Sequence, residues 1–238
     1  MNNLKEILRL LFPALYSIAK KMYYAGNRVL LNRSRHEIVF NAIYRKNAWG
    51  DKETHSGAGS NTANTSVIRR ELPSLVKRLD VHTLFDIPCG DFFWMKDINL
   101  EIEHYLGADI VKGLISMNRK RFESPRRVFI VLDLLSDDLP KADLILCRDC
   151  LPHFSFDDIR IALRVVRKSG SRYFLTSTYP SRIENRDIAT GGFRPLNLLI
   201  PPFNFPDPLL TVNEQCEYGN GIYRDKSLSL WELRDLPA

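Results

Sequence analysis

Three aspartates at regular intervals are the residues in this sequence most suited to binding a ligand. Asp86, Asp109 and Asp133 each end a short apolar run, and they lie 23 and 24 residues apart. That interval is about the length of one strand–helix unit. Because parallel strands end at the same edge of a sheet, we expect the three carboxylates to meet there. Gly90, which follows the first acid, allows a tight turn beside the ligand.

A second pair of polar residues follows a fourth apolar run. Asp149 and His153 are four residues apart, so they would face the same way on one helical turn. Either side chain could act as a general base for a hydroxyl group or orient an acceptor. For His153 the alternative is a capping or packing role in the loop.

The hydrophobic pattern indicates the elements that position these residues. Short apolar runs alternate with segments of three- and four-residue periodicity, which is typical of a mostly parallel sheet with helices on both faces. We therefore predict an α/β fold with a doubly wound, Rossmann-like sheet of seven strands. The predicted strands are 83–87, 104–109, 128–132, 142–147 and 171–177, with two more around 220–223 and 227–233. The predicted helices are 67–79, 111–121 and 156–168, with a turn or short helix near 92–98.

Residues 1–64 are predicted to form a helical, basic extension to a domain that spans residues 65–238. Residues 1–50 hold nine basic and two acidic side chains, and residues 4–46 show helical periodicity. Such a helix could contact a membrane surface, or it could be a solvated face without a partner. The sequence shows no interleaving of aromatic and basic residues, so a nucleic-acid partner is a minor alternative.

Composition favours a cytoplasmic protein without a metal cofactor. No apolar run approaches the roughly 20 residues that span a bilayer, and four cysteines suit a reducing compartment. Cys147 and Cys150 form a single Cys-x-x-Cys pair, at a strand end where small buried residues are expected anyway. Without a second such pair, or a cluster of acids or histidines, we predict no metal site.

Over about residues 65–235 these motifs resemble the class I S-adenosylmethionine-dependent methyltransferases. Several strings are similar to a group of small bacterial-type members of that family whose acceptors are mostly unassigned. The strings are Trp49-Gly50, SGAGS at 56–60, PCGDFFWM at 88–95 and RDCLPH at 148–153. The turn differs from the family pattern, because Pro88 and Phe92 stand where glycines are usual. The G-x-G-x-x-G fingerprint of NAD-binding proteins is also absent from the sequence.

The resemblance implies a role for each acid at a strand end. Asp86 and Gly90 match the turn beneath the methionine part of S-adenosylmethionine. Asp109 matches the acid that binds the ribose hydroxyls, and Asp133 matches the residue beside adenine. Asp91 is expected to hydrogen-bond near the cofactor, with turn formation as the alternative.

Two other residues are further candidates for binding the cofactor. The glycine-rich loop 54–66 could be a flexible flap over the cofactor carboxylate, with Arg69 supplying positive charge, or it could be a plain linker. Trp94 could form a wall of the cofactor pocket or belong to the core.

The proline-rich segment 190–208 is expected to cover the acceptor. Arg194 and Asn197 are its polar candidates, and Phe203 and Phe205 could form apolar or sugar-stacking walls. The alternative is a stiff surface loop without substrate contact.

The sequence therefore predicts an S-adenosylmethionine-dependent methyltransferase. We expect it to methylate an oxygen, with nitrogen as the second choice, of a small-molecule or glycan-linked acceptor. Two alternatives stay open: a non-catalytic S-adenosylmethionine-binding scaffold module, and an NAD-dependent oxidoreductase on the same fold class.

Overall fold

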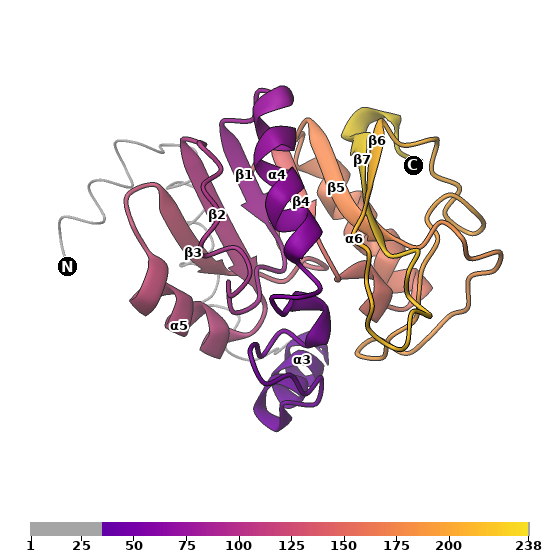
Figure 1. Ribbon diagram of the computed structural model, residues 1–238, viewed down its shortest axis with the longest axis horizontal. Coiled ribbons are helices and arrows are strands. Elements are labelled where there is room, and N and C mark those ends of the chain that lie inside the picture. Colours follow the sequence, from indigo (N-terminus) through magenta and orange to yellow (C-terminus); the bar gives the residue numbers. More distant parts are fainter. Residues whose placement is uncertain (1–34, 238) are drawn as a thin grey trace.

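Seven strands form one sheet in the computed structural model, which describes residues 35–237 (Figure 1). Their spatial order is β3-β2-β1-β4-β5-β7-β6. The strands β1 to β5 pair in parallel, and β7 is antiparallel to both β5 and β6. This confirms the predicted mostly parallel, doubly wound sheet. The strands are β1 (Thr83–Asp86), β2 (His104–Asp109), β3 (Arg127–Val131), β4 (Leu144–Cys147), β5 (Tyr173–Thr178), β6 (Leu210–Asn213) and β7 (Ser227–Glu232).

Helices cover both faces of the sheet (Figure 1). Successive residues of a strand point to opposite faces, so Leu84 and Phe85 belong to different cores. Leu84 packs in the core that contains the apolar side of α4 (Ser66–Arg78) and Ile115 of α5 (Lys112–Phe122). Phe85 packs in the core that contains α6 (Phe156–Lys168). Strands buried on both faces read as continuous apolar runs, as the central strands of this sequence do.

Helix α6 begins directly after the turn that carries His153. Ser155 is the N-cap residue, and its Oγ accepts a hydrogen bond of 3.2 Å from the backbone N–H of Asp158. Asp157 and Asp158 lie in the first turn, where negative charge complements the helix dipole. The predicted bounds of this helix, 156–168, match the observed ones.

One prediction about local structure is wrong. Residues 220–223 form turns instead of a strand, because Asn220 and Gly221 have φ values of 55° and 78°, in the left-handed region that turns favour. The sixth strand of the chain is instead Leu210–Asn213, a four-residue strand at the sheet edge. The segment 92–98 contains turns, the first of the two alternatives that the sequence left open there.

One helix, α3 (Arg35–Lys46), joins α5 to α6 across the sheet edge (Figure 1). Glu37 pairs with Lys112 at 3.0 Å, and His36 Nε2 lies 3.2 Å from Asp158 Oδ2. The rest of the predicted helical segment 4–46, with most of its basic residues, lies outside the described residues. No helix within residues 35–237 is long and apolar enough to cross a membrane.

Candidate active site

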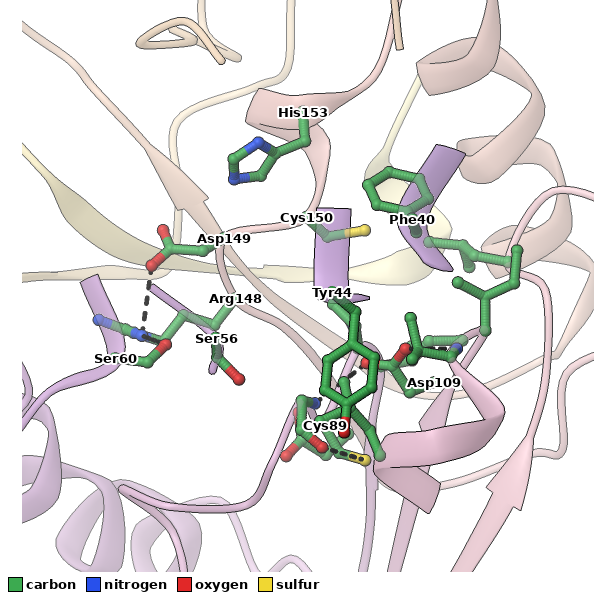
Figure 2. Close-up of a pocket in the computed structure, with 18 of the residues that line it drawn as sticks. Phe40, Tyr44, Ser56, Ser60, Cys89, Asp109, Arg148, Asp149, Cys150 and His153 are labelled. Atoms are coloured by element: carbon green, nitrogen blue, oxygen red, sulfur yellow. Dashed lines mark hydrogen bonds and ion pairs between the residues drawn. The ribbon is translucent and has the colours of Figure 1, made fainter. Parts of the chain in front are cut away.

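A cleft opens at the carboxyl ends of the parallel strands, where the sequence predicts a ligand site (Figure 2). It encloses about 1050 Å³ of empty space, its open mouth included. The strand ends bring together residues that lie far apart in the sequence. The predicted site residues that line the cleft are Asp86, Gly90, Trp94, Asp109, Asp133, Asp149 and His153. The other two, Asp91 and Arg69, are not among its lining residues.

Asp109 is held by two backbone groups at the end of β2. Its Oδ2 accepts a hydrogen bond from Gly90 N at 3.2 Å, and its Oδ1 accepts one from Val111 N at 2.8 Å. Burial raises the pKa of Asp109 to about 6, although these two hydrogen bonds act in the opposite direction. Each carboxylate oxygen keeps a second lone pair, so the group can also accept hydrogen bonds from ligand hydroxyls.

Asp86 lies deeper, at the end of β1, and is 2% exposed. Its Oδ2 accepts a hydrogen bond of 2.5 Å from the Tyr105 hydroxyl. Burial raises the pKa of Asp86 to about 7, partly offset by Tyr105 and Arg148. A buried carboxyl group of this kind ionises more readily when a positive charge enters the cleft.

Asp133 presents an unused acceptor to the cleft. Its Oδ1 accepts a hydrogen bond of 3.0 Å from Leu135 N. Its Oδ2 is buried and has no hydrogen-bond partner among residues 35–237. Leaving a buried acceptor unpaired costs about 1–3 kcal/mol. A ligand N–H or O–H group that reached this oxygen would remove that cost.

Asp91 fastens the glycine-rich loop to the turn after β1. Its carboxylate accepts hydrogen bonds from Thr54 Oγ1 at 2.8 Å, His55 N at 2.8 Å and Ser56 Oγ at 3.1 Å. Charge-assisted bonds of this type are strong, so they anchor the loop over Gly90. Arg69 lies in α4, half-buried, away from the residues that line the cleft.

Four charged side chains form a buried cluster at one end of the cleft, and the sequence prediction missed three of them. Arg148 pairs with Glu214 at 2.5 Å and donates to the Gly59 carbonyl at 2.6 Å. Lys226 pairs with Asp149 at 2.5 Å and lies 3.5 Å from Glu214. The cluster therefore ties the glycine-rich loop to β4, β6 and β7.

A sequence signal for these residues does exist. Arg148 directly follows β4, Glu214 directly follows β6, and Lys226 directly precedes β7. Because β7 is antiparallel to its neighbours, its first residue lies at the same edge as the last residues of β4 and β6. A charged residue adjoining a buried strand at that edge is thus a candidate for the cleft. Trp94 lines the cleft, packs in the core and lies under the Arg148 guanidinium.

Asp149 is an ionised, tightly held carboxylate. Burial opposes its ionisation, but Lys226 and Arg148 prevail and lower the pKa of Asp149 to about 2. The Ser177 hydroxyl donates to its Oδ1 at 3.2 Å. A carboxylate with so low a pKa accepts protons poorly near neutral pH. Its geometry suits the orienting role that the sequence left open.

His153 is better placed to accept a proton. Its Nδ1 lies 2.7 Å from the Gly192 carbonyl oxygen, and because a carbonyl only accepts, the proton of the neutral ring sits on Nδ1. Nε2 is then left with a free lone pair. Burial lowers the pKa of His153, which the Gly192 contact partly counters. The ring is therefore neutral at physiological pH and can act as a base.

Four side chains of the segment 190–208 that the sequence offers as acceptor contacts have structural roles. Arg194 donates hydrogen bonds to the carbonyls of Pro152 at 2.7 Å and Phe154 at 2.9 Å, and so fixes the turn that carries His153. Asn197 donates to the Pro180 and Arg182 carbonyls. Phe203 and Phe205 are buried in the core. These four side chains do not line the cleft.

Helix α3 covers part of the cleft with aromatic side chains (Figure 2). Phe40 and Tyr44 line the cleft, and the Phe40 ring packs against Trp49 at 6.3 Å and Phe154 at 5.9 Å. Within residues 35–237, no group of three or more histidine, cysteine, aspartate or glutamate side chains could hold a metal ion.

Comparison with solved structures places this architecture among known folds. No protein-family model and no curated protein matches the sequence. Human N-acetylserotonin methyltransferase in complex with S-adenosylmethionine superposes with a TM-score of 0.57 at 14% identity, over 94% of this chain and 68% of that chain. The chain has the fold of the class I S-adenosylmethionine-dependent methyltransferases.

Two other similar structures give lower TM-scores. The methyltransferase domain of a bacterial Hen1 protein scores 0.44 at 12% identity, over 48% of this chain and 66% of that chain. Magnesium protoporphyrin IX methyltransferase from Synechocystis scores 0.43 at 14% identity, over 60% of this chain and 69% of that chain. The chain thus spans about two thirds of the length of each structure.

The first prediction concerns the turn at Gly90, which has a φ of +54° and on which a Cβ atom would overlap Ser56 Oγ. Gly90→Ala should lower the free energy of unfolding by about 3 kcal/mol, from left-handed strain and loss of the loop contacts to Asp91. The control is Gly170→Ala, with φ +66° and open space around it, which should cost only about 1–2 kcal/mol. Urea unfolding measures both. Equal losses would contradict the close approach of the loop.

The second prediction concerns the buried charge cluster. Lys226→Met should cost about 3–5 kcal/mol of unfolding free energy, because it leaves Arg148 as the one cation of the cluster beside two carboxylates, Asp149 and Glu214. Lys168 pairs with Asp138 at 2.6 Å, but its side chain is 73% exposed, against 4% for Lys226. Lys168→Met should therefore cost less than about 1 kcal/mol. Urea unfolding measures both variants. Similar losses of unfolding free energy would contradict a stabilising role for the cluster.

Proposed function

We propose that this protein is an S-adenosylmethionine-dependent methyltransferase. The proposal rests on one observation: Asp86, Asp109 and Asp133 line the same cleft. Among the described residues, Asp133 Oδ2 is also buried and has no hydrogen-bond partner. These groups offer acceptors to a ligand that carries hydroxyl and amino donors and a positive charge. Adenosine linked to a sulfonium and an amino acid has that set of groups.

For each part of this cofactor, the cleft has a residue of suitable chemistry. Asp109 is suited to the ribose hydroxyls, because both its oxygens are fixed by backbone N–H groups and keep lone pairs. Asp133 Oδ2 is suited to the adenine amino group. Asp86 and Arg148 lie at the part of the cleft left for the charged amino-acid end. The shared fold with a methyltransferase crystallised with S-adenosylmethionine also supports the proposal.

The chemistry that we propose is methylation of an oxygen in a small molecule. S-adenosylmethionine, when bound, supplies a methyl group on a sulfonium and leaves as the neutral thioether S-adenosylhomocysteine. His153 Nε2 takes the proton of the acceptor hydroxyl as the oxygen gains the methyl group. Asp149 stays ionised and orients groups beside it. The glycine-rich loop and α3 hold the acceptor and exclude water.

The third prediction tests the role of Asp109 through pH. As the pH falls through the Asp109 pKa of about 6, the carboxylate protonates and accepts ribose hydroxyls less well. The dissociation constant of S-adenosylhomocysteine should therefore rise up to about tenfold from pH 7 to pH 5. Asp109→Asn should bind more weakly at pH 7 and show a flatter profile. Calorimetric titration measures both, and an unchanged pH profile in the variant would remove Asp109 from the ribose site.

The fourth prediction tests His153 as the base. His153→Ala should reduce methyl transfer by about a hundredfold or more and leave S-adenosylhomocysteine affinity within about twofold. Since the pKa of His153 is lowered, wild-type turnover should be full at pH 7 and fall only at more acidic pH, a fall that the variant lacks. His82→Ala, whose side chain is 55% exposed at the other end of β1, is the control. Radiolabelled methyl transfer to an acceptor that the wild type uses reports the outcome. Normal turnover in His153→Ala would refute the proposal for this residue.

A further inference from the structure

A strip of aromatic side chains runs outward from His153. The Trp49 ring lies 4.8 Å from the His153 ring, and the Phe193 ring lies 5.4 Å from it. Phe193 in turn lies 5.5 Å from Tyr223, whose ring stacks on Tyr218 at 6.0 Å. These residues come from the segment after α3, from the segment 190–208 and from the turns before β7. The strip therefore forms where three separate parts of the chain meet beside the candidate base.

The strip is accessible to a ligand. Phe193 is 42% exposed and Tyr218 is 55% exposed, while Trp49 and Tyr223 are half-buried. Covering a water-exposed aromatic ring with another ring or an apolar surface lowers the free energy. Because Trp49 and His153 also line the cleft, the strip is continuous with the proposed methyl-transfer site.

Several polar side chains near the strip already have partners in the protein, although the buried atoms Arg182 Nε, Arg194 Nε and Asp225 Oδ2 have none among the described residues. Arg194 and Asn197 donate to backbone carbonyls, Asp149 is paired with Lys226, and Arg182 is paired with Asp225 at 2.9 Å. A sugar carries several hydroxyl groups, and each hydroxyl that lost water without gaining a protein partner here would weaken its binding. An aromatic ring with one hydroxyl group requires only one polar contact, which His153 Nε2 can make.

We infer that the acceptor is a hydroxylated aromatic ring, which packs against Trp49 and Phe193 with its hydroxyl group at His153 Nε2. The inference rests on the proposed function and narrows it from small-molecule and glycan-linked acceptors to aromatic ones. Phe193 and Trp49 then determine acceptor specificity, while the strand-end acids determine cofactor binding. The two sets of residues can be tested separately.

The test is calorimetric titration of the protein loaded with S-adenosylhomocysteine, with 2-naphthol as the probe. We expect 2-naphthol to bind more tightly than its saturated counterpart decahydro-2-naphthol and more tightly than methyl glucoside. Phe193→Ala should weaken 2-naphthol binding about three- to tenfold and leave S-adenosylhomocysteine binding unchanged. Trp49→Ala is a second variant with the same expected effect. Ile183→Ala, at a residue that is 97% exposed, is the matched control and should change neither.

The outcomes separate this inference from the proposed function. If S-adenosylhomocysteine binds but 2-naphthol does not, or if 2-naphthol binds the wild type and both aromatic variants equally, the aromatic acceptor is wrong and the methyltransferase proposal stands. Tighter binding of methyl glucoside than of 2-naphthol would also overturn it. Failure of the wild type to bind S-adenosylhomocysteine would overturn the proposed function itself, and the inference with it.

Discussion

Burial of carboxyl groups at one sheet edge is the constraint on which the rest of the site depends. The pKa values of Asp86 and Asp109 are raised to about 7 and about 6, because both groups are removed from water. Their ionised forms become favourable when a ligand brings hydrogen-bond donors or positive charge. The negatively charged pyrophosphate of a dinucleotide would meet repulsion from the same groups. This electrostatic difference is the physical reason to prefer an adenosyl sulfonium to NAD in this cleft.

The part of the cleft around Arg148 has a different balance of charge. Arg148 and Lys226 equal Asp149 and Glu214 in number and are opposite in sign, and the four side chains form one network of ion pairs. Because the formal charges cancel, this cluster adds little net field while it fixes the glycine-rich loop and the end of β4. It also keeps Asp149 ionised, which is the reason that we propose His153 as the proton acceptor. The aromatic strip that we propose for the acceptor begins at His153, beside this cluster.

The sequence sufficed for the features that depend on local pattern. Apolar runs that end in an acid predicted the strands and the meeting of Asp86, Asp109 and Asp133, because parallel strands share an edge. The pairing of Arg148 with Glu214 was not predictable in that way, since 66 residues separate them and neither belongs to a periodic pattern. The contacts of Arg194 could not be predicted either, because its partners are backbone carbonyls, which no side-chain pattern reveals. The short edge strand 210–213 lacks the apolar run that marked the others.

The central claim is that the strand-end acids form a site for an adenosyl cofactor without a pyrophosphate. Parallel calorimetric titrations of the wild-type protein with S-adenosylhomocysteine and with NADH test it most directly. We predict that each chain binds one S-adenosylhomocysteine molecule and that NADH at the same concentration gives no heat of binding. Binding of NADH in preference to S-adenosylhomocysteine, or of neither ligand, would contradict it.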